Sequence, residues 1–479
     1  MPIATRKDVR ASLPSRGLRA KGTTFIRSEC GIGALMPWAD KLWITTYPDE
    51  NGNGGGMGLW SLDEDGNMVL VSETNGTHAG RACSGDYAFI GEHKIHRDGT
   101  VIRMTGFGAD VRITAWAKVP GQTPDSNGNV WVYALGMDGS IFRVKDSASP
   151  TVTFVGNAAA GLGIVGQPHF KAMWGTPKRL YVVSNINFPD GRAGYLDLTT
   201  LGGTLAWTRL DTGVATGASH IEVAGSYDGN GHVFALGQDQ WTGFLHLIHG
   251  NDAGPARRFL IPLASRQQVK GWQQEWMRIR QADTTERYLM DFHGCYYALS
   301  PFLDSTDGND SQTTGFPRLE ALGMHTRTTT DFAVFDGKLW LGSNSSSTQS
   351  SNKYPNAGQS ASILWSVASV DELLSMTRKP RASGAFYWQK AIPAATESEP
   401  MLARGYDKKV ILIKNGTAST SSTITVYGYW GDRKQAIGTV AVAGGELKTF
   451  PIPDGVHPDW VSVSSSAAIE PSSIWMDLS

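Results

Sequence analysis

The stretch "NVWVYALGMDGSIFRVKD" at residues 129–146 decides the fold. Two runs rich in β-branched and aromatic residues flank the turn sequence "MDGS", a pattern typical of a β-hairpin. Units of this kind recur seven times, starting near Leu42, Tyr87, Val130, Leu180, His232, Tyr288 and Leu339. Their spacing of roughly 45 to 55 residues is the period of propeller blades and exceeds that of helical solenoids. The sequence therefore predicts an all-β, seven-bladed β-propeller.

The rest of the chain divides around this repeat. Residues 1–20 are polar and basic and are expected to form an N-terminal arm, while the propeller is expected at 21–400. Residues 401–479 contain further strand-like runs at hairpin spacing and predict a short C-terminal β appendage that packs on or closes the propeller. The segment "SVDELLSMTRK" has a clear helical signature, with Ser369 as the cap and Glu372 three residues on.

The composition limits the classes of function. The net charge of the 479 residues is -1, which gives no electrostatic case for nucleic acid or an anionic membrane as a partner. The 56 glycines suit a turn-rich β protein, and the 16 tryptophans suit sugar binding, because an indole face packs on a pyranose ring. Cys30, Cys83 and Cys295 form no close-spaced pair, so neither a disulfide scaffold nor a zinc ribbon is indicated.

The stretch "GWQQEWMRIR" concentrates charged and aromatic residues in one probable strand. Trp276, Arg278 and Arg280 alternate along it and would share one face. Two guanidinium groups beside an indole form a binding site for a carboxylate on a sugar ring. In the alternative interpretation Arg278 forms an ion pair with Glu275 or Asp291 on an ordinary blade surface.

Several histidines stand where blades begin. His78 lies in "NGTHAGR", His93 follows in "FIGEH", and His169 shares a face with Lys171 in "GQPHFKAMW". For each of these histidines taken alone a structural role is favoured over a catalytic one, and their concentration where blades begin is what indicates a site. His293 and the cysteine two residues later could supply two of four zinc ligands, so a structural zinc or calcium ion stays open.

These motifs together resemble a known family. "ECGIGALMPWADKLWITTY", "NGTHAGR", "PHFKAMW", "GWQQEWMRIR" and "LMDFHGCYYALSPF" are similar to segments of seven-bladed propellers that cleave rhamnose–glucuronic acid linkages. The family includes L-rhamnose-α-1,4-D-glucuronate lyases acting on gum arabic and arabinogalactan, a related α-L-rhamnosidase branch and, more distantly, propeller ulvan lyases. The resemblance extends over nearly the whole chain.

The resemblance implies β-elimination at a uronic acid, with no cofactor required for catalysis. Such chemistry needs a partner for the uronate carboxylate, a base, and an acid for the departing oxygen. The residues matched to these roles are Tyr133 as acid, His78 as base, His93 and His169 as the rest of the histidine cluster, Arg278, Arg280 and Lys171 on the carboxylate, and Trp276 and His293 lining the sugar subsite. Nearby cations are expected to lower the pKa of Tyr133.

Two other functions stay open. One is hydrolysis of the same linkage, either by an α-L-rhamnosidase-type site or by a carboxylate pair drawn from Asp138, Glu275 and Asp291. The rhamnosidase branch is expected to use a histidine of the first blade, and none precedes His78. The other is a non-catalytic sugar-binding propeller. In each case the expected partner is an acidic polysaccharide or oligosaccharide, and the expected location is secreted or periplasmic, although the start of the chain shows no signal peptide.

Overall fold

The structure of the protein is a computed structural model. It describes the chain in fifteen stretches: residues 31–47, 58–74, 80–108, 111–166, 168–185, 192–210, 219–225, 232–239, 241–248, 256–264, 278–282, 288–304, 315–325, 329–343 and 364–479. The expected N-terminal arm at 1–20 lies outside these residues. Among the described residues, strands predominate and the helices are short, so the predicted all-β class is confirmed.

The first 27 strands form seven successive antiparallel sheets within the described residues. The first three sheets contain β1 (Gly31–Trp38), β2 (Lys41–Tyr47), β3 (Gly58–Leu62) and β4 (Met68–Glu73); β5 (Arg81–Ser84), β6 (Tyr87–Ile90), β7 (His93–His96) and β8 (Val101–Arg103); and β9 (Ile113–Lys118), β10 (Trp131–Gly136), β11 (Ser140–Lys145) and β12 (Val152–Asn157). The fourth and fifth contain β13 (Phe170–Gly175), β14 (Arg179–Ser184), β15 (Ala193–Asp197) and β16 (Trp207–Arg209); and β17 (Ser219–Gly225), β18 (Val233–Gln238), β19 (Gly243–Ile248) and β20 (Arg257–Ile261). The last two contain β21 (Arg278–Gln281), β22 (Tyr288–Phe292), β23 (Cys295–Asp304) and β24 (Phe316–Met324); and β25 (Thr329–Phe335), β26 (Lys338–Ser343) and β27 (Leu364–Val367).

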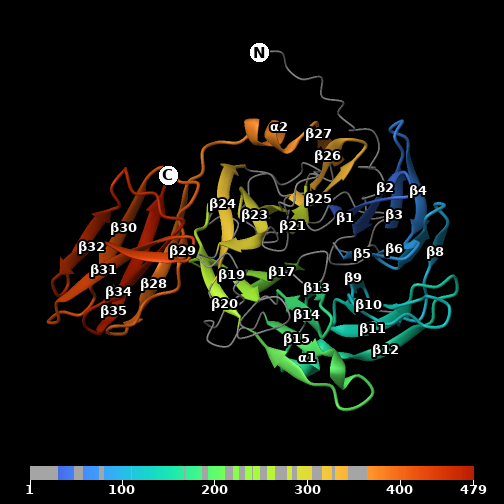
Figure 1. Ribbon diagram of the computed structural model, residues 1–479, viewed down its shortest axis with the longest axis horizontal. Coiled ribbons are helices and arrows are strands. Elements are labelled where there is room, and N and C mark those ends of the chain that lie inside the picture. The colour runs from blue at the N-terminus through green and yellow to red at the C-terminus, as the bar shows by residue number, and fades with distance from the viewer. Residues whose placement is uncertain are drawn as a thin grey trace, which may run out of the picture.

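The seven sheets follow one another around a common centre (Figure 1). The first strands of neighbouring sheets touch one another from β5 through β9, β13, β17 and β21 to β25. The seventh sheet contacts the first, because β25 and β26 both pack against β1, and β1 in turn touches β6. The first strand of each sheet is therefore the innermost one.

The seven predicted hairpins correspond to the second and third strands of the sheets. The unit at Val130, for example, is β10 with β11, and the unit at Tyr288 is β22 with β23. Middle strands carry the strongest apolar signal because both of their faces are covered, as the fully buried β18 shows. The inner strands, which line the centre, therefore lie just before the segments that the repeat detects.

The helices in the described residues are short. They are α1 (Ala158–Gly161) and α2 (Val370–Ser375), which lie between sheets, and a 3₁₀ turn at Leu198–Thr200, which lies between β15 and β16 of the fourth sheet. The helical signature predicted for 369–379 is confirmed by α2: the Ser369 hydroxyl accepts a hydrogen bond from the backbone N–H of Glu372, and the Glu372 carboxylate accepts one from the N–H of Ala368.

The remaining strands form a C-terminal pair of sheets. They are β28 (Ala382–Ile392), β29 (Met401–Leu402), β30 (Lys409–Lys414), β31 (Ser422–Trp430), β32 (Arg433–Val442), β33 (Leu447–Pro451), β34 (Trp460–Ser465) and β35 (Ile469–Leu478). One sheet has the order β28-β35-β30-β33, and the other runs β29-β34-β31-β32. β28 belongs to the first of these sheets, because it pairs along its length with β35, and the boundary at residue 401 stays a prediction.

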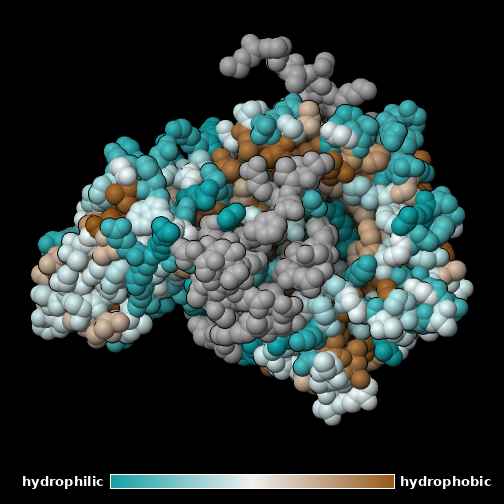
Figure 2. Space-filling model, viewed as in Figure 1, coloured by the Kyte–Doolittle hydropathy of each residue, from teal (hydrophilic) through white to brown (hydrophobic). Residues whose placement is uncertain are grey.

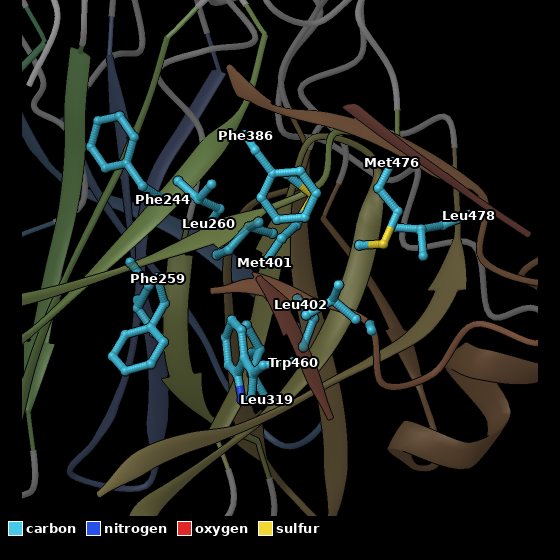
Figure 3. Packing of buried hydrophobic residues seen from close by; sticks show 14 of the residues in the cluster. Phe244, Phe259, Leu260, Leu319, Phe386, Met401, Leu402, Trp460, Met476 and Leu478 are labelled. Atoms are coloured by element: carbon cyan, nitrogen blue, oxygen red, sulfur yellow. The ribbon is translucent and has the colours of Figure 1, made fainter. Parts of the chain in front are cut away.

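A shared apolar core joins this unit to the ring. β29 pairs in parallel with β20, so the fifth sheet continues into the C-terminal one. Figure 3 shows Phe259 and Leu260 of the ring beside Met401 and Trp460 of the C-terminal strands. The ring centroids of Phe259 and Trp460 are 5.0 Å apart. Burial of several large side chains at this junction ties the two parts into one folded body.

The visible surface carries few large apolar patches. Figure 2 shows mainly teal and pale residues over the C-terminal sheets, with brown regions concentrated on the ring. Within the described stretches, no helix has the length and apolar character required to cross a membrane.

Candidate functional site in the central channel

Small residues on the inner strands leave a cavity at the centre of the ring. The cavity has a volume of about 600 Å³ and is lined by residues of the first six sheets. Its small lining residues are Gly80, Ala82, Ala115, Ala117, Ala172, Gly175, Ala224 and Gly225. Seven converging strands enclose more space than Gly and Ala side chains fill, so room for a ligand remains.

Glycine permits two of these strands to approach their neighbours closely. A Cβ on Gly80 would lie 1.9 Å from the Cα of Ala115, and a Cβ on Gly175 would lie 2.3 Å from the carbonyl oxygen of Lys118. These contacts fix the second sheet against the third and the fourth sheet against the third. They also show which residues of neighbouring strands lie at the same depth in the channel.

An ionic network spans the inner strands at one end of the cavity. Arg280 on β21 places Nη1 3.1 Å from Oε2 of Glu222 on β17, and Nε 3.0 Å from Oδ1 of Asp331 on β25. Asp331 also forms an ion pair with Arg81 on β5, whose Nη1 lies 3.3 Å from Oδ2 of Asp331. Its Oδ2 accepts a hydrogen bond of 2.9 Å from the backbone N–H of Leu35 on β1. Five of the seven sheets are thereby linked through two carboxylates.

A further cation stands behind this network. Arg278, on the same face of β21 as Arg280, lies with Nη1 3.9 Å from Glu222 Oε2, and its side chain is 2% exposed. Three guanidinium groups therefore lie near two carboxylates in a water-poor environment. Charge interactions are stronger there than on the surface, so the network holds its members firmly.

The described lining of the cavity contains one carboxylate and three cations. Arg81, Lys118 and Arg280 are the cations, and Glu222 is the carboxylate, while Asp331 lies fully buried behind Arg81 and Arg280. The excess of positive charge favours an anionic ligand.

Aromatic residues complete the cavity wall. Trp116, Trp174 and Tyr288 all line it. The Tyr288 hydroxyl donates a hydrogen bond of 3.1 Å to the carbonyl oxygen of Gly225. Trp116 donates from Nε1 to the carbonyl oxygen of Gly91 at 2.8 Å, which fixes its ring. Aromatic faces beside cations are the side-chain set expected for an acidic sugar.

The structure places three of the predicted site residues on inner strands and a fourth next to one. Arg278 and Arg280 both reach Glu222, so they share a face as predicted, although Arg280 alone of these four lines the cavity. Lys171 lies on β13 and is buried. His169 immediately precedes β13, and its backbone N–H donates to the Ser184 hydroxyl at 3.3 Å.

Tyr133 lies away from the cavity. It is on β10, the second strand of its sheet, where it is buried in the core between the third and fourth sheets. The expectation that cations lower its pKa is wrong: burial raises the pKa of Tyr133, and the opposing effect of Arg143 is smaller.

Two predicted histidines are buried outside the cavity lining. Burial is the main cause that lowers the pKa of His93, on β7, to about 4, and the charge of Arg103 adds to the effect. Burial lowers the pKa of His293 to about 3. His293 occupies the turn between β22 and β23 with a φ of 50°. His78 and Trp276 fall outside the described residues.

The carboxylates considered for hydrolysis also have structural partners. Asp138 accepts hydrogen bonds from the backbone N–H and the hydroxyl of Ser140 in a turn. Asp291 Oδ1 lies 3.1 Å from Nε2 of His325, whose ring stacks on Tyr296 at 4.0 Å. Glu275 lies outside the described residues. No group of three or more metal-binding side chains occurs in the described part of the chain, and burial raises the pKa of the Cys295 thiol to about 12.

Sequence reasoning missed the residues that complete the site. They are Arg81, Lys118, Trp174, Glu222, Tyr288 and Asp331. Five of the six lie on inner strands that precede the predicted hairpins: Arg81, Lys118, Trp174, Glu222 and Asp331. Arg81 and Trp174 are the last residues of the quoted motifs "NGTHAGR" and "PHFKAMW", and this membership is the sequence signal that could have found them.

Comparison with known proteins finds distant structural likeness only. No family model matches the chain, and no curated protein matches it. Similar solved structures include the Dos1 propeller, with 8% identity and a TM-score of 0.37 over 66% of this chain and 90% of that one. The polysaccharide lyase Uly1 has 10% identity and a TM-score of 0.34 over 75% and 93%. The exo-β-1,3-galactanase Pc1,3Gal43A of Phanerochaete chrysosporium has 9% identity and a TM-score of 0.25 over 76% and 100%. Values this low assign neither a family nor an activity.

Proposed function

We propose that the chain is a closed seven-bladed β-propeller and a polysaccharide lyase that cleaves a rhamnose–glucuronic acid linkage by β-elimination at the uronate. The closed ring is supported by the seven successive sheets and by the packing of β25 and β26 against β1. The activity is supported above all by one observation. Arg81 and Arg280 lie at one end of a central cavity, and Glu222 is the single carboxylate in the described lining of that cavity.

The arginines match the main electrostatic demand of the reaction. Loss of the proton at C5 places negative charge on the uronate carboxylate, and a positioned cation stabilises that charge. Arg280 can take this role because Glu222 and Asp331 hold its guanidinium at 3.1 and 3.0 Å. Side chains fixed in advance do not need to reorganise when the charge develops. Arg81 supplies a second guanidinium from the opposite side of Asp331.

The proton transfers need a base for C5 and an acid for the departing oxygen. As the C5–H bond breaks, its electrons form the C4=C5 double bond, the C4–O bond breaks, and the released rhamnose oxygen takes a proton. Tyr288 is our candidate for one of these transfers, because it lines the cavity beside the strand that carries Arg280. The base assigned to His78 by the family resemblance remains a prediction.

The test is the near-ultraviolet absorbance of an unsaturated uronate during incubation with gum arabic, an arabinogalactan protein and ulvan. We expect absorbance to rise with at least one polymer and to be abolished in Arg280→Met, while Arg97→Met, which removes an exposed cation paired with Asp86, leaves it unchanged. Release of rhamnose without this absorbance would assign hydrolysis instead. Binding without either product would assign a sugar-binding propeller.

A further inference from the structure

Lys118 is a cation at the outer part of the cavity. It is the last residue of β9, its side chain is exposed, and it lines the cavity. No carboxylate forms an ion pair with Lys118 among the residues that the structure describes. The cation differs in this from Arg81 and Arg280, which both contact Asp331. An exposed ammonium group in a concave site is available to a ligand.

The positive charges of Arg81 and Lys118 lie at two different depths along the channel. Gly80, next to Arg81, abuts Ala115 of β9, so Arg81 and Ala115 lie at similar depth. Lys118 is three residues further along the same strand, which is about 10 Å at the rise of a β-strand. Lys118 therefore lies well beyond the ionic network, at the level where Gly175 touches its carbonyl oxygen.

The intervening wall suits a sugar ring. Trp174 lines the cavity next to Gly175, and a Cβ on Gly225 would lie 2.5 Å from its Nε1, which places the indole against β17. Cys83 of β5 also lines the cavity. Burial raises the pKa of the Cys83 thiol, and Arg81 and Lys118 both oppose that rise, so the thiol lies within the field of both cations.

We propose that the cavity takes a saccharide that carries two acidic groups, one held by Arg81 and Arg280 and the second by Lys118. This inference rests on the proposed function, in which the cavity binds a saccharide that contains a uronate. It adds that the saccharide carries a second acidic group. Lys118 is then a specificity-determining residue for the unit next to the one that reacts.

Cys83 offers a test that needs no turnover. The rate at which N-ethylmaleimide modifies the Cys83-containing peptide is measured by mass spectrometry, which separates it from Cys30 and Cys295. Galacturonic acid, digalacturonic acid and neutral cellobiose are compared as protecting ligands. We expect digalacturonic acid to protect at a concentration about tenfold lower than galacturonic acid, since one charge-assisted contact is worth roughly that factor.

The variants decide where the second charge is held. Lys118→Met should remove the advantage of digalacturonic acid and leave protection by galacturonic acid unchanged. Lys178→Met, at an exposed lysine outside the cavity, is the matched control and should behave as wild type. An advantage that persists in Lys118→Met overturns the inference, as does equal protection by the two acids in the wild type.

The protection experiment can fail or succeed independently of the polymer-cleavage assay that tests the proposed function. Polymer cleavage without a Lys118-dependent advantage leaves the lyase proposal standing and overturns the inference. A Lys118-dependent advantage without cleavage supports the diacid site and removes the catalytic assignment. Protection by cellobiose as strong as by the acids overturns the charge-based reading of the cavity.

Discussion

The guanidinium Nε of Arg280 lies 3.0 Å from Oδ1 of Asp331 and joins the inner strands of the sixth and seventh sheets. Asp331 is fully buried and also meets Arg81 and the backbone of Leu35. One carboxylate thus fixes the position of both arginines proposed to hold the substrate. The network serves folding and the site together, because removing a member takes a charged contact from a buried group.

Asp331→Asn should therefore destabilise the fold strongly. The amide loses the charge that balances Arg81 and Arg280, and breaking a buried pair costs about 3–5 kcal/mol. The measurement is the free energy of unfolding from urea denaturation. Asp86→Asn, which breaks the exposed Arg97 pair, is the control and should change little. An equal effect of the two substitutions would contradict the role given to Asp331.

The sequence predicts the sheets better than the site, for a physical reason. Middle strands such as β10 and β18 are covered on both faces and read as apolar runs, so the repeat is visible. Several inner strands carry small or charged residues in place of an apolar run: β5 reads "RACS" and β21 reads "RIRQ". Such strands have no apolar signal that marks them as lining the channel.

The partners in the ionic network also cannot be read from local spacing. Arg81 and Asp331 are 250 positions apart and meet because the seventh sheet returns to the start of the ring. The alternation in "MRIR" did predict correctly that Arg278 and Arg280 share a face, since that depends on one strand alone. Their protein partner, Glu222, comes from another sheet and had no local signal.

Tyr133 and Tyr288 should behave differently when each loses its hydroxyl group. Tyr133 lies in the core of the third and fourth sheets, so Tyr133→Phe should keep the rate of polymer cleavage near wild type. Tyr288 lines the cavity, and Tyr288→Phe should lower kcat about 10²-fold or more if it transfers a proton. Initial rates of unsaturated uronate formation measure both. Loss of activity in Tyr133→Phe alone would return catalysis to the residue that the family resemblance indicates.

Acid should destabilise the protein through its buried histidines. His93 and His293 have folded-state pKa values of about 4 and about 3, below the ordinary value of 6.5. Between pH 6.5 and 4 the unfolded chain binds more protons at both sites, so the free energy of unfolding falls as pH falls. Each histidine contributes a slope of about 1.4 kcal/mol per pH unit in this interval.

Substitution identifies these two contributions. Urea denaturation at pH 7 and pH 5 should show a smaller pH effect in His93→Gln and in His293→Asn than in the wild type. Asparagine is chosen at position 293 because it tolerates the positive φ of 50° there. His96→Gln, at a half-buried histidine on the same strand as His93, is the comparison. A pH effect unchanged in both variants would contradict the assignment.

Filling the channel should abolish ligand binding while the fold persists. Cys83 lines the cavity and is exposed, so a larger side chain can enter the space without displacing core residues. Cys83→Phe should prevent both polymer cleavage and binding of acidic oligosaccharides, whereas Cys83→Ser, which keeps the volume, should retain both. Calorimetric titration and initial rates measure the two effects, and urea denaturation checks that Cys83→Phe is folded. Full activity in folded Cys83→Phe would place the substrate away from this part of the cavity, because the phenyl ring would occupy the space beside position 83.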